Sequence, residues 1–178
     1  MNITSIEGDK EVVVKHFIDS LSPLPFIPSD GFLMDIGSGG GFPGLPIKIS
    51  IPSLRVLLLD SSHKKIVFLK NLIRGIGLKG IEALNQRAEN RGFQEVMKAT
   101  VDVVISRATL SLDSFIPAGA PYVKGGGILI AMRGKGGTQE IQDSRAYQDK
   151  FGLRVEKVEE LSLPMDMGKR TLIILRKV

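Results

Sequence analysis

Short apolar segments alternate with longer amphipathic segments along most of the chain. The short segments predict strands at Phe32–Ile36, Leu54–Leu59, Gly80–Leu84, Val101–Ser106, Gly127–Met132, Leu153–Leu163 and Arg170–Lys177. Apolar residues at helical spacing predict helices at Lys10–Leu21, Ser61–Arg74, Ala88–Met97, Leu112–Tyr122 and Thr138–Phe151. This alternation is typical of an α/β fold in which helices cover both faces of a parallel sheet.

The last two predicted strands have no helix between them. A parallel crossover needs a dozen or more residues, usually arranged as a helix, so we expect the final strand to be antiparallel. A seven-stranded, mostly parallel sheet with its last strand reversed is the Rossmann-like arrangement of class I S-adenosylmethionine methyltransferases. A plain dinucleotide-binding Rossmann fold has no need of this terminal hairpin.

The length of 178 residues fits one domain of ordinary size. We predict a single domain over residues 1–178. Residues 1–30 form an N-terminal helix and a proline-containing linker that cap the site, and residues 31–178 form the Rossmann-like core. Hydrophobic residues make up 43% of the chain and charged residues 24%, which is typical of a globular protein with a full core.

The composition argues against several classes of site. The chain has no cysteine, which excludes disulfides and a zinc–thiolate site, and its two histidines are too few for a typical histidine-based metal site. No apolar run approaches the roughly 20 residues that span a bilayer, and the polar N-terminus shows no secretory signal. We therefore expect a cytoplasmic, metal-independent monomer without membrane contact.

The net charge of +5 permits binding to nucleic acid but does not establish it. Most of the excess positive charge lies after Lys124. A basic protein with ordinary solvated lysines would show the same balance.

The strongest local pattern is the glycine-rich segment from Asp35 to Gly44, which follows a predicted strand and precedes a helix. Glycines allow positive φ and let the backbone approach a ligand closely. The candidate cofactor-binding residues of this loop are Asp35, Gly37, Ser38, Gly39, Gly41 and Phe42. Glycines at 39, 41 and 44 also match the dinucleotide fingerprint, so S-adenosylmethionine, a nicotinamide cofactor and a structural turn all remain possible from the glycines alone.

Two acidic residues at predicted strand ends bear on that choice. Asp35 can receive the cationic amino group of a methionine moiety, directly or through water, whereas it would repel a pyrophosphate. Its alternative role is to cap a turn. Asp60 ends the second strand, where a carboxylate can bind both ribose hydroxyls of either cofactor. Together with the terminal hairpin, Asp35 favours S-adenosylmethionine.

Five cations are expected at the edge of the sheet where the cofactor binds. Ligands of open α/β sheets lie outside the carboxyl ends of the parallel strands. The residues that follow those strands, or begin the reversed one, are Arg107, Arg133, Lys135, Lys169 and Arg170. Such a rim suits phosphates, although scattered solvated side chains are the alternative for each residue.

The sequence contains no obvious general base. It lacks the Asp/Asn-Pro-Pro-aromatic signature of amino-group methyltransferases and any nucleophilic cysteine. A hydroxyl or amine acceptor often needs proton removal, whereas guanine N7 already offers a lone pair. Catalysis at N7 reduces to alignment and electrostatic positioning, for which Arg107 is the candidate residue.

With these residues identified, the chain resembles the bacterial 16S ribosomal RNA guanine-N7 methyltransferases, also called glucose-inhibited division protein B. The resemblance covers nearly the whole chain. The matching segments are Asn2–Ile6, Lys15–Leu21, Asp35–Gly44, Leu59–Ser61, Lys64–Leu69, Arg87–Glu89 and Ser106–Ala108.

The resemblance implies roles for individual residues. Gly37 and Phe42 match positions that contact S-adenosylmethionine, and Ala88 and Glu89 match a pair next to the adenine. Arg107 matches an arginine at the cofactor and acceptor.

The resemblance also concerns the acceptor. Arg170 matches a basic position at the start of the last strand. His16 and Asp19 match a His-x-x-Asp-Ser-Leu element, which is otherwise explained as a local pair on one helix face. The implied substrate is a guanine in the 16S RNA of the small ribosomal subunit, and the implied product is S-adenosylhomocysteine.

This chain departs from the family pattern at two places. Members usually carry a further helical stretch before the segment that matches Asn2, and they often show Lys-Gly where this chain has Arg133-Gly134. An arginine keeps the charge but changes the donor geometry.

Fold alone does not select the function. The rivals to rRNA methylation are a small-molecule methyltransferase, a non-catalytic RNA-binding protein that kept the cofactor fold, and a nicotinamide-dependent oxidoreductase. Phe42 is a further open point, because core packing under the first helix of the fold would explain it as well as a contact to a ligand.

Overall fold

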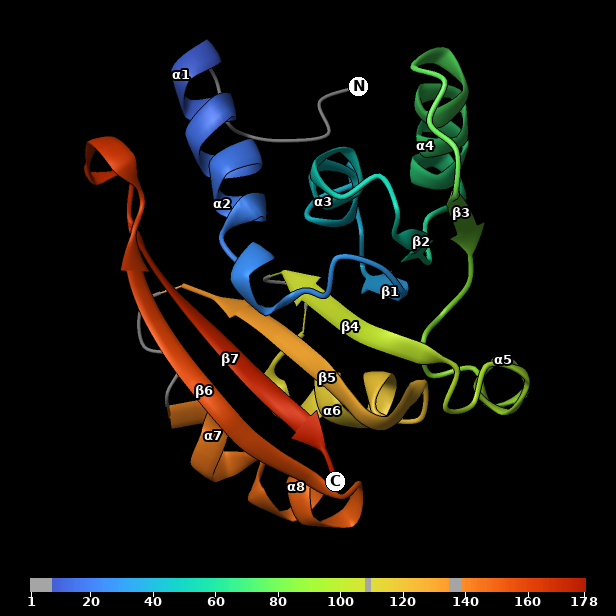
Figure 1. The fold of residues 1–178 in the computed structure, drawn as a ribbon, viewed down its shortest axis with the longest axis vertical. Coiled ribbons are helices and arrows are strands. Elements are labelled where there is room, and N and C mark those ends of the chain that lie inside the picture. Colours follow the sequence, from blue (N-terminus) through green and yellow to red (C-terminus); the bar gives the residue numbers. More distant parts are fainter. Residues whose placement is uncertain (1–7, 108–109, 135–138) are drawn as a thin grey trace.

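The computed structural model describes residues 8–107, 110–134 and 139–178. In these residues seven strands form one sheet in the order β3-β2-β1-β4-β5-β7-β6 (Figure 1). The strands are β1 (Phe32–Ile36), β2 (Arg55–Asp60), β3 (Ile81–Asn85), β4 (Val101–Arg107), β5 (Val123–Arg133), β6 (Leu153–Ser162) and β7 (Lys169–Lys177). β7 is antiparallel to both β5 and β6, and the pairs among β1 to β5 are parallel. The prediction of a reversed last strand is confirmed.

Helices cover both faces of the sheet. They are α1 (Asp9–Val12), α2 (Asp19–Leu21), α3 (Gly44–Ser50), α4 (His63–Gly75), α5 (Arg91–Val96), α6 (Leu112–Gly119), α7 (Gln139–Asp143) and α8 (Arg145–Lys150). A π-helical segment, Val13–Ile18, joins α1 to α2, and short 3₁₀ turns occur at Leu24–Phe26 and Pro164–Asp166. In the described residues no helix is long and apolar enough to cross a membrane.

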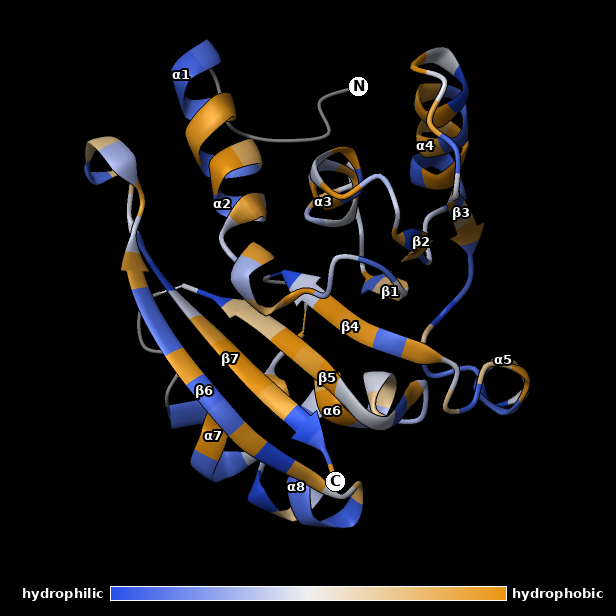
Figure 2. Ribbon diagram, in the orientation of Figure 1, coloured by the Kyte–Doolittle hydropathy of each residue, from blue (hydrophilic) through white to orange (hydrophobic). Residues whose placement is uncertain are grey.

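The sheet has a separate hydrophobic core on each face. One core contains Phe115 of α6 and Tyr122, both without exposed surface. The other contains Ile47 of α3 and Leu69 of α4, which are equally buried. Figure 2 shows the inner strands β4, β5 and β7 as mostly hydrophobic, whereas hydrophobic and polar residues are interspersed along the edge strand β6. Burial on both faces explains the uninterrupted apolar runs of the inner strands.

The N-terminal helix is continuous from Asp9 to Leu21, because the junction residues Val12 and Asp19 keep helical backbone angles. Sequence periodicity predicts the helix but not its π-helical centre. The segment expected to be a plain linker contains a 3₁₀ turn, and Ile27 within it is buried in the core on the α3 side. The N-terminal residues therefore pack on the sheet.

Several boundaries differ from the prediction. α5 begins at Arg91 rather than Ala88, because the Asn90 side chain accepts a hydrogen bond from the Phe93 amide and caps the helix there. The predicted polar helix is divided at Ser144 into α7 and α8, and its predicted first residue, Thr138, lies outside the described residues. β5 starts earlier than predicted, at Val123.

Candidate functional site

The glycine loop connects β1 to α3 at the carboxyl edge of the sheet. Gly37, Gly39 and Gly41 have φ values of 74°, 57° and 98°, which L-residues rarely adopt. The amides of Gly37 and Ser38 both donate to the Leu59 carbonyl over 2.9 Å, which ties the loop to the end of β2. A Cβ on Gly41 would meet the Leu69 side chain at 3.0 Å. Glycine is therefore required here by both conformation and space.

Asp35 lies beneath this loop and is completely buried. Its Oδ2 accepts a hydrogen bond of 2.9 Å from the amide of Gly44, the first residue of α3. Its Oδ1 is buried and has no hydrogen-bond partner among the described residues. Burial raises the pKa of this carboxyl from 3.8 to about 7, against the opposing effects of the Gly44 amide and the Arg107 charge. A cationic ligand group above the loop would favour the ionised form.

Asp60 ends β2 and is nearly buried. Its Oδ2 accepts from the Gly39 amide at 2.9 Å and its Oδ1 from the Ser62 amide at 2.8 Å. The Lys65 ammonium lies 3.6 Å from Oδ2. Each carboxylate oxygen retains a further lone pair, so the side chain can still accept from hydroxyl groups.

A pocket of about 240 Å³ opens beside Asp60. Ala88 and Glu89 line one side, and Gly37 lines the end nearest the glycine loop. The Ala88 carbonyl is held by the Tyr122 hydroxyl, which donates to it over 2.7 Å. The sequence-predicted residues Asp60, Ala88 and Glu89 are thus brought together here.

A second pocket, of about 260 Å³, lies on the other side of the loop. It is lined by His16, Gly37, Ser38, Gly39, Gly40, Phe42, Phe68 and Arg107. Gly37 lines both pockets, so the two are neighbours at this residue.

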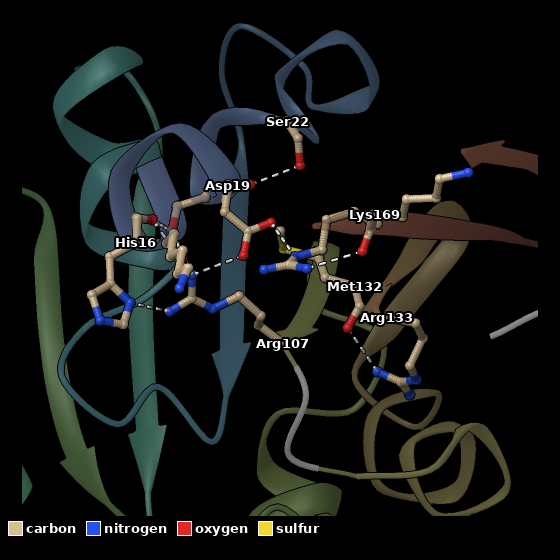
Figure 3. A network of polar contacts seen from close by, with 10 residues as sticks. His16, Asp19, Ser22, Arg107, Met132, Arg133 and Lys169 are labelled. Carbon is tan, nitrogen blue, oxygen red and sulfur yellow. Dashed lines mark hydrogen bonds and ion pairs between the residues drawn. The ribbon is translucent and has the colours of Figure 1, made fainter. Parts of the chain in front are cut away.

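Arg107, the last residue of β4, connects this second pocket to the N-terminal helix. Its Nη1 donates to the Lys15 carbonyl over 3.1 Å and to Asp19 Oδ2 over 3.3 Å. Its Nη2 lies 3.3 Å from His16 Nδ1, and its guanidinium lies 5.3 Å from the centre of the Phe42 ring. Figure 3 shows Arg107 directed at His16 and Asp19. Burial lowers the pKa of the guanidinium, whereas Asp19 and Asp35 raise it.

His16 and Phe42 stack at the entrance to the second pocket. Their ring centres are 4.8 Å apart and the ring planes differ by 20°. Phe17 meets Phe42 edge-on, at 5.3 Å. Phe42 therefore packs against the N-terminal helix and lines the pocket at the same time. Burial and the Arg107 charge lower the pKa of His16 below 6.5, while Asp19 raises it.

Of the five predicted rim cations, Arg107 and Arg170 converge. Arg170 Nε donates to Asp19 Oδ1 over 3.0 Å, so the same carboxylate holds both arginines. Lys169 is exposed at the start of β7, beside Arg170. Lys135 lies outside the described residues.

Arg133 differs from the expectation of a surface contact to RNA. Only 6% of its side chain is exposed, and its Nε pairs with Glu140 Oε2 over 3.1 Å. Its Nη1 donates to the Met132 carbonyl (Figure 3). The first turn of α7 covers it with this carboxylate, so its charge is directed into the protein.

Sequence reasoning missed several residues that line the two pockets. They include Lys65, Phe68, Gln86 and Leu110. Gln86 directly follows β3, a position that topology alone marks as part of the site edge. Phe68 gave no such signal, because it lies inside a predicted helix rather than at the end of a strand. No cluster of histidine and acidic residues in the described part of the chain could hold a metal ion.

Comparison with known proteins identifies the family of this chain. The model of the rRNA small subunit methyltransferase G family matches residues 1–173. The protein of that name from Acetivibrio thermocellus is 40% identical over 99% of this chain and 73% of its own length. The one from Syntrophus aciditrophicus is 41% identical over 98% of this chain and 73% of its own length.

The chain belongs to the rRNA small subunit methyltransferase G family. As a member it is an S-adenosylmethionine-dependent rRNA methyltransferase, which confirms the resemblance found in the sequence. Solved structures confirm the class I methyltransferase fold. An S-adenosylmethionine-dependent methyltransferase from Aquifex aeolicus superposes with a TM-score of 0.73 at 16% identity, covering 99% of this chain and 97% of that one. TYW2 from M. jannaschii, solved with AdoMet, gives 0.73 at 12% identity, covering all of this chain and 81% of that one.

Proposed function

We propose that this protein transfers the methyl group of S-adenosylmethionine to N7 of a guanine in 16S rRNA. Family membership supports small-subunit rRNA as the acceptor. We propose further that residues 31–178 form the catalytic core and residues 1–30 cap it, and that the protein acts as a cytoplasmic monomer. The choice of the N7 atom rests on the chemistry of the second pocket.

The assignment of N7 as the acceptor atom is supported by the hydrogen-bonding role of His16. It is the only side chain among the described pocket-lining residues that could serve as a neutral base near Arg107. A guanidinium can only donate hydrogen bonds, so the contact to Arg107 Nη2 makes His16 Nδ1 an acceptor. The neutral ring then carries its hydrogen on Nε2 and offers no lone pair there. A pocket without an available base suits an acceptor atom that already has a lone pair.

The pocket geometry supports a specific placement of the cofactor. We place its adenine against Ala88 and Glu89 and its ribose at Asp60, because these residues line the first pocket. Gly37 would hold the methionine tail near Asp35, because the absence of a Cβ lets a ligand approach the backbone there. When bound, the cofactor supplies an electrophilic methyl group at its sulfonium centre.

The protein's own contribution is positioning. Gly37, Ser38 and Gly39 line the second pocket and would contact the methionine tail. Phe42 and His16 close one side of the second pocket, and Arg107 sets the distance between the N-terminal helix and β4. Holding nucleophile, methyl carbon and sulfur in line accounts for a large part of the rate enhancement of such transfers.

The proposal is tested by methyl transfer from radiolabelled S-adenosylmethionine to small ribosomal subunits isolated from cells lacking this protein. We expect label on one guanine of 16S rRNA, with the alkaline lability of an N7-methylated base. Subunits from cells that contain the protein are the control and should accept little label. Label on another atom would refute the N7 assignment, and RNA that stays unlabelled while a small molecule is methylated would refute the rRNA substrate.

A further inference from the structure

The carboxylate of Asp19 is shared between the two arginines that converge on the site. Only 3% of this side chain is exposed. Its Oδ2 is 3.3 Å from Arg107 Nη1 and its Oδ1 is 3.0 Å from Arg170 Nε. These contacts join α2 to the end of β4 and to the start of β7. In the sequence, Asp19 is 88 residues from Arg107 and 151 residues from Arg170. One buried carboxylate thus fixes the relative position of three elements (Figure 3).

The positive charges of Arg107 and Arg170 oppose each other at this site. The charge of Arg170 is one of the influences that lower the pKa of Arg107, and Asp19 is the largest of those that raise it. Like charges at short distance in a partly buried site repel each other strongly. Asp19 therefore neutralises the repulsion and orients both guanidiniums, each through a charge-assisted hydrogen bond.

We propose that Asp19 is a positioning residue for methyl transfer, which holds Arg107 and Arg170 in the arrangement that the acceptor RNA meets. The inference rests on the proposed function. Asp19 touches neither pocket and acts through the arginines. Arg107 lines the second pocket, so a displacement of its guanidinium changes the place where the acceptor guanine is held.

If Asp19 positions the arginines, removing its charge should affect RNA binding and turnover differently. A carboxylate near the acceptor RNA repels phosphates, so its removal should leave RNA affinity equal or higher. The same removal frees the two arginines from their common partner. A displacement of about 1 Å at a reacting centre can cost roughly a hundredfold in rate. A residue with only a structural role would lower folding stability and shift both quantities in the same direction.

The test is the variant Asp19→Asn, assayed with labelled S-adenosylmethionine and small subunits that lack the modification. Asparagine keeps the size, but because each carboxylate oxygen faces a different arginine, its NH2 group places a donor against one of the two guanidiniums. We expect kcat to fall by roughly tenfold to a hundredfold, with the RNA Kd equal to wild type or lower. In the double variant Asp19→Asn/Arg170→Ala, the loss should be smaller than the product of the two single losses, because both changes break one interaction.

Asp149→Asn is the matched control. Asp149 also pairs with two arginines, Arg145 at 3.8 Å and Arg154 at 3.3 Å, but it is 55% exposed and distant from both pockets. This variant should keep wild-type kcat and Kd. The wild-type protein in the same assay separates the proposed function from the proposed role of Asp19. An inactive wild-type protein would refute the function itself.

Two results would overturn the role of Asp19. One is wild-type kcat in folded Asp19→Asn protein. The other is a parallel loss of kcat and RNA affinity together with a lower Tm. If Asp19→Asn does not fold, Asp19→Glu replaces it, since this variant keeps the charge and moves it by one methylene. A lower kcat at unchanged Tm and Kd then supports positioning, and unchanged kcat contradicts it.

Discussion

The buried carboxyl of Asp35 leads to a quantitative prediction about the cofactor-free protein. The residue has no exposed surface, and burial raises its pKa from 3.8 to about 7. Because the folded state holds the proton more tightly than the unfolded state, the stabilising contribution of this group is fully present below pH 3.8. It is lost as the pH rises through about 7. A shift of this size corresponds to about 4 kcal/mol at full ionisation.

Asp35→Asn removes this ionisation. The Asn oxygen can still accept from the Gly44 amide, but the amide nitrogen replaces Oδ1, which has no partner among the described residues. An unsatisfied buried donor costs about 1–3 kcal/mol. We therefore expect the cofactor-free variant to be more stable than wild type at pH 8, by about 1–3 kcal/mol. This stability advantage over wild type should shrink as the pH falls to 5. The same variant should bind S-adenosylmethionine more weakly.

Urea denaturation at pH 5, 6, 7 and 8, without and with the cofactor, measures both effects. Asp60→Asn is the control at the same edge of the sheet, because both of its oxygens accept backbone hydrogen bonds. That variant should lose stability and retain the pH dependence that Asp35→Asn abolishes. The reasoning is refuted if Asp35→Asn is less stable than wild type at pH 8 and shows the same pH dependence, or if it binds the cofactor with wild-type affinity.

Three further predictions concern the surroundings of the site. In Gly44→Ala, the added Cβ would lie 2.5 Å from Leu58 and 2.9 Å from Asp35 Oδ2. We expect the free energy of unfolding to fall by about 1–3 kcal/mol, and calorimetry to show weaker cofactor binding. Arg133→Ala should lower Tm, by removal of the ion pair with Glu140, and leave RNA affinity in a filter-binding assay nearly unchanged, because Arg133 is buried. His16 has a pKa below 6.5 in the folded protein, so its stabilising contribution is present above pH 6.5 and lost as the pH falls through the folded value. Tm of wild type should therefore fall relative to His16→Asn in that range.

Each of these predictions has its own control or contrary result. Gly75→Ala is matched to Gly44→Ala, since nothing lies within 4 Å of its added Cβ, and it should keep cofactor binding. If Arg133→Ala weakened RNA binding at unchanged Tm, the side chain would be a surface contact after all. Parallel Tm curves for wild type and His16→Asn between pH 5 and 7.5 would show that the protonation of His16 is not linked to folding stability.

The positions of the strands and of the glycine loop could be predicted because they depend on local patterns. The apolar run of β1 and the Gly-rich turn after it occupy the predicted residues, and the lack of a helix before β7 was enough to predict its reversal. Boundaries were less accurate where one side chain decides them. Asn90 caps α5, which therefore begins three residues after the predicted start, and the π-helical centre of the first helix has no signature in its apolar spacing.

The family, the fold and the position of the glycine loop could be predicted from the sequence because each depends on residue types at short, regular spacing. The partners of the charged side chains were decided only by the tertiary structure. Arg107, Arg133 and Arg170 all follow or begin strands at one edge, and the sequence predicted for all three the same basic rim. Packing made them different, because α2 places a buried carboxylate between Arg107 and Arg170, whereas α7 places Glu140 over Arg133. An ion pair depends on where distant elements meet in space, and periodicity along the chain carries no information about that.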